Sequence, residues 1–309
     1  MVDLILFGDC KETLKQFPRG SAQMCVTSPP YYGLRDYGGE ANQIGQEETP
    51  EEFVNNLVEV FREVRDVLKD DGVLWLNIGD SYYNYRPGTG GLPKQTVSKT
   101  SQDLPTQCNR RANKLDGLKE KDLIGIPWML AFALRADGWY LRQDIIWHKP
   151  NPMPESVKDR CTKSHEYIFL LSKNKKYYYD NEAIKEPVKQ DWGTRNRDAG
   201  KYHNPGTGLQ PHSGLTKSYE RKNKRDVWTI TNKPYKGAHF AVFPPDLIEP
   251  CILAGSERGD IVLDPFMGSG TTGMVAKKHG RNYIGCELHE DYASLQTDRI
   301  DSIPCQLML

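Results

Sequence analysis

Residues 261–273 read Ile261-Val-Leu-Asp264-Pro-Phe-Met-Gly268-Ser-Gly270-Thr-Thr-Gly273, an apolar run that leads into a glycine-rich turn. We predict a strand at Ile261 to Leu263 and a helix from Gly270 to His279. The glycines let a ligand approach the backbone closely, and the N–H groups at a helix N-terminus favour an anionic group. No lysine follows Gly270, which disfavours a phosphate-binding P-loop, and the G-x-x-G half of the dinucleotide fingerprint does not fit.

An acidic residue, Glu287, follows the glycine-rich turn at a spacing found in nucleotide-binding folds. Glu287 lies 23 residues after Asp264, at the end of the next apolar strand, which we predict at Asn282 to Cys286. In nucleotide-binding folds, an acidic side chain about 20 residues after the turn binds the ribose diol. The turn and Glu287 together predict a site for a nucleoside-containing cofactor.

A second motif, Thr27-Ser28-Pro29-Pro30-Tyr31-Tyr32, follows a predicted strand at Ala22 to Thr27. The two prolines end the strand in a rigid turn. The Ser28 hydroxyl oxygen and the Pro29 carbonyl can accept the two protons of an exocyclic amino group on a base, which frees the nitrogen lone pair for attack. The Tyr31 ring can stack on a base that has left the helix, worth about 1–3 kcal/mol. Without a cofactor site nearby, such a motif is more often only a turn.

Predicted strands and helices alternate along most of the chain, which indicates an α/β fold with a largely parallel sheet. Further strands are predicted at Asp3 to Phe7, Val73 to Ile78, Tyr140 to Trp147 and Glu166 to Ser172, and further helices at Pro50 to Lys69, Leu123 to Ala136 and Pro245 to Ala254. From Asn181 to Ala238 the apolar periodicity fades, and this segment is the best candidate for an inserted module.

Composition places the chain among ordinary globular proteins: it has 309 residues, of which 38% are hydrophobic and 27% charged. Basic and acidic residues both number 41, so the net charge does not indicate a nucleic-acid partner. Two segments, Arg86 to Lys121 and Lys217 to Lys236, nevertheless each carry five more basic than acidic residues. Both have the composition of loops, and such loops are able to meet phosphate or to form a solvated surface.

Cysteine usage and apolar runs exclude several classes of protein. The seven cysteines are scattered without a C-x-x-C pair, so neither a zinc site nor a disulfide framework is indicated, and we expect no metal. No apolar stretch approaches the roughly 20 residues that a membrane span requires. We therefore expect a cytoplasmic protein without a membrane partner.

At this point the residues resemble a known family, the amino DNA methyltransferases of bacteria and phages. The segment Asp264-Pro-Phe-Met-Gly-Ser-Gly-Thr-Thr looks like their cofactor-binding motif, and Ser28-Pro-Pro-Tyr31 looks like their catalytic motif. The catalytic motif comes first, which is the order of the β class. Weaker similarities occur at Leu6 to Cys10, Trp147 to Asn151 and His239 to Pro245, so the resemblance covers about three-quarters of the chain.

The resemblance implies a circularly permuted, Rossmann-like fold with a mostly parallel seven-stranded sheet and S-adenosylmethionine as the cofactor. Residues 1–180 and 239–309 would form the catalytic domain, with a basic loop insert at about 85–122, and residues 181–238 the target-recognition region. The implied catalytic residues are Ser28, Pro29, Pro30 and Tyr31. The implied cofactor-binding residues are Asp9, Cys10, Phe240, Asp264, Phe266, Gly268, Ser269, Gly270, Thr271, Thr272 and Glu287.

Individual roles also follow from the resemblance. Asp9 would accept from the adenine amino group of the cofactor, Phe266 would pack on that ring and Glu287 would hold the ribose. Asp264 and the turn from Gly268 to Thr271 would bind the methionine end. Double-stranded DNA is the implied partner, and the basic residues expected to contact it are Lys149, Lys217, Arg221, Lys222, Lys224 and Arg225.

The implied reaction is direct methyl transfer to the exocyclic N4 of a flipped cytosine, because family members with Ser at the first motif position mostly act there. Adenine N6 is the alternative target. Methylation of RNA and a non-catalytic DNA-binding role stay open, and the aromatic residues that keep RNA open are Tyr85, Trp192, Tyr202, Tyr219 and Trp228. A covalent mechanism at cytosine C5 is disfavoured because neither Cys251 nor Cys305 has the required context. The sequence leaves open the oligomeric state and a partner restriction endonuclease.

Overall fold

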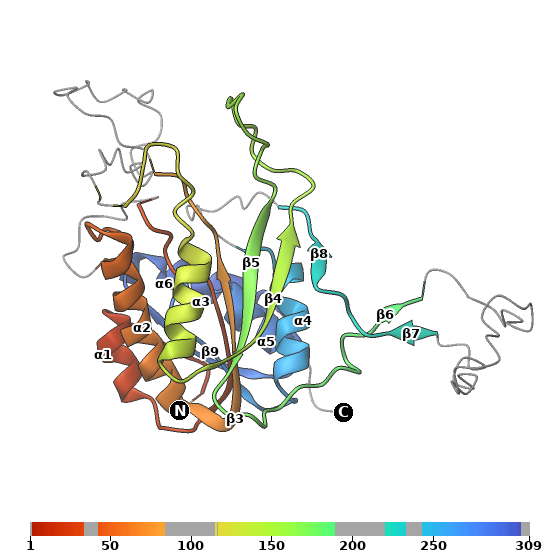
Figure 1. The fold of residues 1–309 in the computed structure, drawn as a ribbon. Helices are drawn as coiled ribbons and strands as arrows, with labels where there is room; N and C mark the ends of the chain where they lie inside the picture. The colour runs from red at the N-terminus through yellow and green to blue at the C-terminus, as the bar shows by residue number, and fades with distance from the viewer. Residues whose placement is uncertain are drawn as a thin grey trace, which may run out of the picture.

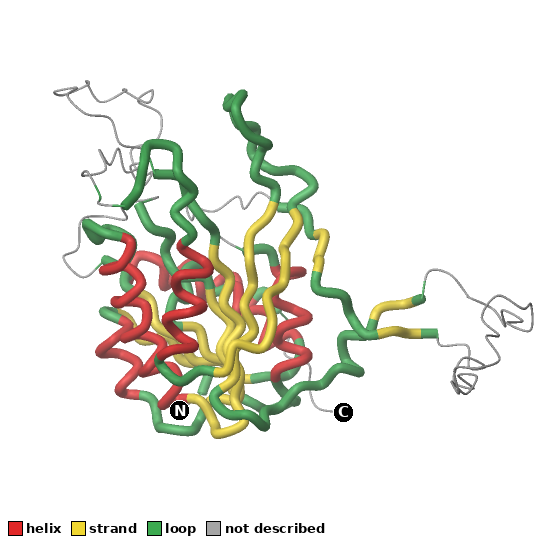
Figure 2. The backbone as a smooth tube through the Cα atoms, viewed as in Figure 1, coloured by secondary structure: helices red, strands yellow, loops and turns green. Residues whose placement is uncertain are grey.

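A computed structural model describes residues 2–33, 43–83, 115, 117–188, 220–232 and 243–303. These residues form a three-layered α/β structure in which helices cover both faces of a central sheet (Figures 1 and 2). The sheet has eight strands in the order β1-β10-β9-β2-β3-β5-β4-β8, and a separate two-stranded sheet pairs β6 with β7. Among the described residues, no helix has the length and apolar character needed to cross a membrane.

The strands of the main sheet are β1 (Leu4–Phe7), β2 (Ala22–Thr27), β3 (Leu68–Ile78), β4 (Tyr140–His148), β5 (His165–Ser172), β8 (Val227–Thr229), β9 (Ile261–Asp264) and β10 (Asn282–Glu287). The small sheet consists of β6 (Glu186–Pro187) and β7 (Arg221–Lys222). The α-helices are α1 (Cys10–Thr13), α2 (Pro50–Val67), α3 (Ile126–Ala136), α4 (Pro245–Gly255), α5 (Thr271–Lys278) and α6 (Ala293–Asp301), with 3-10 turns η1 (Leu14–Gln16) and η3 (Glu290–Tyr292).

The main sheet is mostly parallel, as predicted. Among its described strands, only β5 runs antiparallel to its neighbours, β3 and β4, and all other pairs are parallel. The predicted number of seven strands was one too low, because β8 pairs with the end of β4 through Ile146, Trp147 and His148. This strand has three residues and lies in the segment 181–238, so part of that segment extends the main sheet.

The longest helix, α2, shows why these residues form these elements. Thr49 accepts a hydrogen bond from Glu52 N at 3.1 Å, and the Glu52 carboxylate accepts from Thr49 N at 3.2 Å, so a complete capping box starts the helix. Its apolar positions, including Phe53, Leu57 and Phe61, are fully buried. The helix ends at Val67, two residues before the predicted end.

Each face of the sheet contributes to its own apolar core. On β3, Leu74 and Leu76 pack with α1, α2 and α3, whereas Val73 and Trp75 pack with α4 and α5. This alternation follows from the period of two along a strand. Burial on both faces is the pattern expected for a parallel sheet, and it keeps the sheet rigid where its strands end.

Candidate active site

The residues of the two sequence motifs meet at one edge of the sheet, where the parallel strands end. Asp9 follows β1, Glu287 ends β10, Asp264 ends β9 and Ser28 follows β2, and these four strands are neighbours in the sheet. The carboxyl ends of strands in open α/β sheets are where ligands bind. Residues separated by more than 230 positions in the chain therefore belong to one site.

Asp264 joins the cofactor motif to the catalytic motif. Its Oδ1 accepts hydrogen bonds from Thr27 Oγ1 at 2.6 Å and from Phe266 N at 3.0 Å, and its Oδ2 accepts from Thr272 Oγ1 at 2.6 Å. Burial raises the pKa of this carboxyl to about 6, while the three donors act in the opposite direction. Because Thr27 directly precedes Ser28, the carboxylate links the turn after β9 to the turn that carries Ser28.

The glycine-rich turn is held by contacts within the fold. Gly270 has a φ of 79°, in the left-handed region that glycine adopts freely, and it directly precedes α5. The Gly268 carbonyl accepts from Gln296 Nε2 at 2.7 Å, and Ser269 Oγ accepts from Arg299. Contacts from α6 thus hold the backbone of the turn in place before any ligand binds.

Glu287 is buried, and burial raises the pKa of its carboxyl. Its Oε2 accepts from Gly268 N at 2.7 Å and its Oε1 accepts from His289 N at 3.1 Å. Each oxygen is an acceptor with further capacity, which suits the two hydroxyls of a ribose. Glu287 also connects to the first strand, because Gly8 N donates to the Glu287 carbonyl at 2.8 Å.

Asp9 and Cys10 lie at the start of α1, beside the end of β10. Asp9 is the N-cap of this helix and its Oδ1 accepts from Lys11 N at 2.9 Å. Cys10 is buried, and burial raises the pKa of its thiol. A buried, protonated thiol is a packing group, so Asp9 is the polar group that this corner offers to a ligand.

The turn after β2 presents the Ser28 hydroxyl and the Pro29 carbonyl. Ser28 is half-buried and Pro29 is buried. Neither the Ser28 hydroxyl nor the Pro29 carbonyl forms a hydrogen bond within the described part of the chain, so both oxygens are available as acceptors. The chain then bends back at Gly45, where Gly33 N donates to the Gly45 carbonyl at 2.9 Å.

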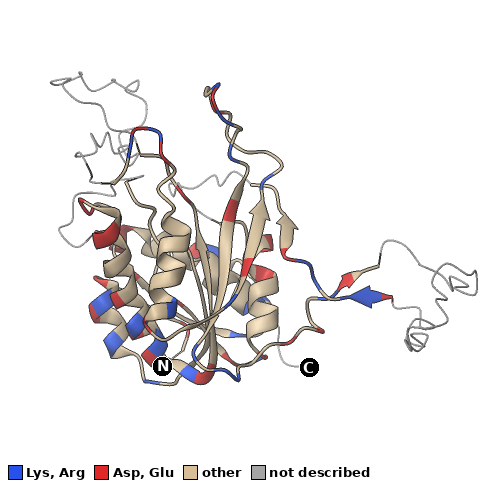
Figure 3. Cartoon of the chain, in the orientation of Figure 1, with Lys and Arg blue, Asp and Glu red and all other residues tan. Residues whose placement is uncertain are grey.

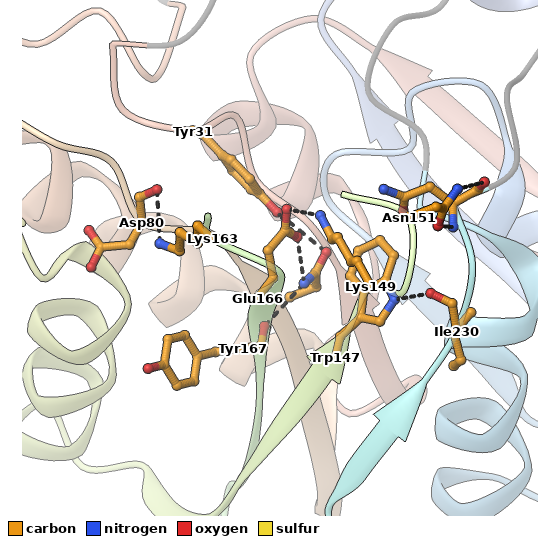
Figure 4. A network of polar contacts seen from close by, with 11 residues as sticks. Tyr31, Asp80, Trp147, Lys149, Asn151, Lys163, Glu166, Tyr167 and Ile230 are labelled. Atoms are coloured by element: carbon orange, nitrogen blue, oxygen red, sulfur yellow. Dashed lines mark hydrogen bonds and ion pairs between the residues drawn. The ribbon is translucent and has the colours of Figure 1, made fainter. Parts of the chain in front are cut away.

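Tyr31 leads to residues that the sequence did not point to. Its hydroxyl donates to Glu166 Oε2 at 2.7 Å, and its ring lies so close to Gly79 that a Cβ there would come within 2.6 Å of Tyr31 Cε2. Stacking of the Tyr31 ring on a base therefore stays a prediction. Figure 4 shows Glu166 between Tyr31 and Lys149, and Lys149 Nζ donates to Glu166 Oε1.

Sequence reasoning missed Glu166 and Asn77. Asn77 Nδ2 donates to the Tyr167 carbonyl at 3.1 Å and to Glu166 Oε2 at 3.4 Å. Both residues sit among apolar neighbours in predicted strands, and a charged residue at the start of the run Glu166 to Ser172 was the only available signal. The antiparallel pairing of β5 brings Glu166 to the same edge as the parallel strand ends.

A second lysine, Lys163, lies beside this group on the other side of Tyr31 (Figure 4). Its Nζ donates to the Asp80 carbonyl at 3.1 Å, and burial lowers the pKa of its amine. Asp80 Oδ1 accepts from Gly125 N at 3.0 Å and from Ile126 N at 3.1 Å, so this oxygen holds the start of α3.

The predicted DNA-contacting residues fall into two places. Lys149 lies at the site, whereas Arg221, Lys222, Lys224 and Arg225 belong to or follow β7, which lies away from the main sheet and stands out in blue in Figure 3. The Arg225 guanidinium donates two hydrogen bonds to the Glu186 carboxylate, at 2.9 and 3.2 Å, and Arg225 N donates a third at 3.0 Å. This partner lowers the pKa of the Glu186 carboxyl to about 2.

Two further contacts involve Arg221 and Lys224. Arg221 donates to the Lys185 carbonyl at 2.9 Å, and Lys224 Nζ lies 4.8 Å from the centre of the Trp228 ring. The predicted residues Phe240 and Lys217 lie outside the described residues, as do most of the basic segment Arg86 to Lys121 and Cys305.

A family comparison matches this arrangement. The model of the DNA methylase family (N6_N4_Mtase) matches residues 22–298 of the chain, a span that contains both the Ser28 motif and the glycine-rich turn. The chain belongs to this family. The family predicted from the two motifs is therefore confirmed.

Curated relatives align with nearly the whole chain of this methylase. The chain is 49% identical over 296 residues to the type II methyltransferase M.SmaI of Serratia marcescens, and the alignment covers 96% of this chain and 90% of that protein. It is 46% identical over 293 residues to the type II methyltransferase M.Cfr9I of Citrobacter freundii, covering 95% of this chain and 86% of that protein.

Solved structures share the fold of this methylase. A putative DNA modification methylase from Thermus thermophilus, complexed with S-adenosyl-L-methionine, aligns with a TM-score of 0.61 at 25% identity, covering 98% of this chain and 95% of that chain. The PvuII DNA methyltransferase, described as cytosine-N4-specific, aligns with a TM-score of 0.62 at 19% identity, covering 96% and 88%. The predicted Rossmann-like fold is thus confirmed.

Proposed function

We propose that this methylase transfers a methyl group from S-adenosylmethionine to the exocyclic N4 of a cytosine in duplex DNA. The observation that carries the proposal is the placement of two acceptors that no described residue occupies, the Ser28 hydroxyl and the Pro29 carbonyl, beside the glycine-rich turn. The hydrogen bond from Thr27 to Asp264, 2.6 Å long, joins the two turns directly.

The chemistry requires a nitrogen with an available lone pair. The exocyclic amino nitrogen of a base is a poor nucleophile because its lone pair is delocalised into the ring. Acceptors aimed at its two protons favour a pyramidal nitrogen, and the Ser28 hydroxyl and the Pro29 carbonyl would act in this way. The prolines hold both acceptors without further ordering, so catalysis would come mainly from positioning.

The residues present fit S-adenosylmethionine, which supplies an electrophilic methyl group when bound. Asp9 would accept from the adenine amino group and Glu287 from the ribose hydroxyls. In the turn from Gly268 to Thr271, the backbone N–H groups of Ser269 and Thr271 would bind the carboxylate of the methionine end, since Gly268 N donates to Glu287 and Gly270 N donates to the Met267 carbonyl. Asp264 would act through the turn rather than by contact, because its oxygens already accept three hydrogen bonds.

Direct transfer agrees better with the structure than a covalent adduct at cytosine C5. Cys251 is buried in α4, its Sγ donates to the Leu247 carbonyl at 3.6 Å, and burial raises the pKa of its thiol. A buried, protonated thiol within a helix is not a nucleophile.

The target base has to leave the duplex to reach Ser28, at a cost of a few kcal/mol. Ser28 at the first motif position favours cytosine N4, and adenine N6 is the second candidate because its amino group has the same chemistry. RNA is the less favoured substrate. Of the aromatic residues that keep it open, Trp228 is buried and donates to the Arg225 carbonyl at 2.7 Å, and the other four, Tyr85, Trp192, Tyr202 and Tyr219, lie outside the described residues.

We further propose that residues 181–238 recognise the DNA site and that Lys222 and its basic neighbours contact phosphates. The two-stranded arm of β6 and β7 supports this proposal, because it lies away from the catalytic sheet and carries several basic residues. A restriction endonuclease that acts on the same site is a partner that the two type II relatives suggest.

The decisive experiment incubates the protein with methyl-labelled S-adenosylmethionine and mixed-sequence duplex DNA, digests the DNA to nucleosides and identifies the labelled product by mass and chromatography. We expect labelled N4-methylcytosine. Labelled N6-methyladenine would keep the mechanism and overturn the choice of base, and an absence of label in DNA would contradict the proposed function.

A further inference from the structure

Lys149 is unusually enclosed for a lysine. Its side chain is 16% exposed, as is that of its ion-pair partner Glu166, and its Nζ lies 4.1 Å from the centre of the Trp147 ring. Lysine ammonium groups are strongly hydrated and seldom buried unless a function or a partner compensates. Here the compensation comes from one carboxylate and one aromatic face.

The ammonium keeps donors to spare. It carries three N–H bonds, and in the described part of the chain its only hydrogen-bond acceptor is Glu166. The backbone at this position is held separately, because Lys149 N donates to the Ser164 carbonyl at 2.7 Å. The other N–H bonds have no oxygen or nitrogen acceptor among the described residues, so the ammonium is able to donate to a ligand.

Glu166 places these donors next to the catalytic motif. The same carboxylate that accepts from Lys149 accepts from the Tyr31 hydroxyl at 2.7 Å, so a single side chain connects Lys149 to the Ser28 motif (Figure 4). Of the other nearby donors, Asn77 Nδ2 donates to the Tyr167 carbonyl and Lys163 Nζ donates to the Asp80 carbonyl, so Lys149 is the ammonium that Glu166 connects to the Ser28 motif.

The edge of the target base then decides what Lys149 can do. If Ser28 and Pro29 accept the protons of N4, the next groups along that edge of cytosine are N3 and O2, both acceptors. The corresponding groups of adenine are N1 and the C2–H, so adenine has no acceptor at the second position. A donor that reaches the second position therefore distinguishes the two bases.

We propose that Lys149 donates a hydrogen bond to O2 of the flipped cytosine and thereby determines specificity for cytosine over adenine. Glu166 and Trp147 act as positioning residues for the Lys149 ammonium. This inference rests on the proposed function, since it requires that the methylated base is a cytosine.

The test is a double-mutant cycle in which one change is made in the protein and the other in the target base. The methylated sequence is first mapped on the labelled DNA. The substrates are two duplexes with this sequence, one with cytosine and one with an aminopyridine C-nucleoside that keeps N3 and the amino group but has hydrogen in place of O2. The kcat/KM for methylation is measured for the wild-type protein and for Lys149→Met. We expect the wild type to prefer cytosine by about 10- to 100-fold, as for a charge-assisted hydrogen bond, and Lys149→Met to lose most of this preference.

Two variants keep the interpretation clear. Lys149→Met leaves the Glu166 charge uncompensated, so the double variant Lys149→Met with Glu166→Gln is measured beside it, with cofactor affinity as the check on folding. Lys163→Met removes the neighbouring ammonium, and its ratio between the two substrates should stay that of the wild type.

Each outcome bears on one proposal. Equal rates of the wild type on both duplexes, or an unchanged preference in the Lys149 variants, would overturn the role of Lys149 while leaving cytosine methylation intact. If the wild-type protein methylates no cytosine in either duplex, the proposed function itself fails.

Discussion

The two halves of the sheet edge differ in how their charged side chains are hydrogen-bonded. On the half that we propose to bind the cofactor (the cofactor half), at β1, β10 and β9, Asp264 and Glu287 accept from backbone N–H groups and threonine hydroxyls within the protein. On the half that we propose to bind the base (the base half), at β3, β5 and β4, Lys149 pairs with Glu166 and has further N–H bonds without an acceptor among the described residues. A preformed turn suits a cofactor that is the same molecule in every reaction. Donors without an internal acceptor suit the recognition of one base among several.

The largest expected effect tests the junction between the two halves. Ser28→Ala removes one acceptor for the amino protons and should lower kcat by about 100- to 1,000-fold, comparable to the loss of one group that stabilises a transition state. Cofactor affinity, measured by calorimetric titration, should stay within about twofold because the turn at Gly268 is untouched. Loss of cofactor binding in this variant would show that the two halves are not separable at Ser28.

The cofactor half should make the free energy of unfolding depend on pH through Asp264. Burial raises the pKa of Asp264 from its ordinary value to about 6, so its contribution to the free energy of unfolding is largest at low pH and declines as the pH rises through 6. Asp264→Asn removes this titration. Between pH 4.5 and 7.5 the stability of the wild type should therefore fall relative to the variant by about 2 kcal/mol, as measured by urea unfolding. Parallel pH curves would contradict the buried charge.

The base half is expected to respond in DNA kinetics only. Glu166→Gln keeps an acceptor for the Tyr31 hydroxyl but breaks the ion pair with Lys149, and kcat/KM for DNA should fall by about tenfold while cofactor affinity is unchanged. The matched control is Glu155→Gln, which removes a carboxylate paired with Arg160 at 2.5 Å in the loop between β4 and β5. Equal losses in the two variants would argue against a special role of Glu166.

The smallest effect concerns the arm that lies outside both halves. If Lys222 contacts a phosphate, Lys222→Ala should reduce the slope of log affinity against log salt by about 0.9 and weaken DNA binding by a few-fold. Lys278→Ala is the control, since Lys278 pairs with Glu249 at 2.8 Å at the far end of α5. An unchanged slope, measured by fluorescence anisotropy at several salt concentrations, would exclude this contact.

Much of the fold was predictable because its signals are local. Apolar runs, the capping residue Thr49 and the glycine turn at 268–270 are each specified by neighbouring residues, and the elements they predict are found within a few residues of the expected limits. The strand β8 was not predictable, because three residues in a segment without apolar periodicity do not form a readable pattern.

The sequence by itself predicted the glycine-rich turn with Glu287 and the Ser28 motif, because the residues of each lie close together along the chain. Only the tertiary structure decided the base half. Tyr31, Asn77, Lys149 and Glu166 come from separate segments, and they meet because β5 runs antiparallel to β3 and β4 and so starts where the parallel strands end. The tertiary structure also decided that Asp264 braces two turns, since only a folded sheet places Thr27 and Thr272 on one carboxylate.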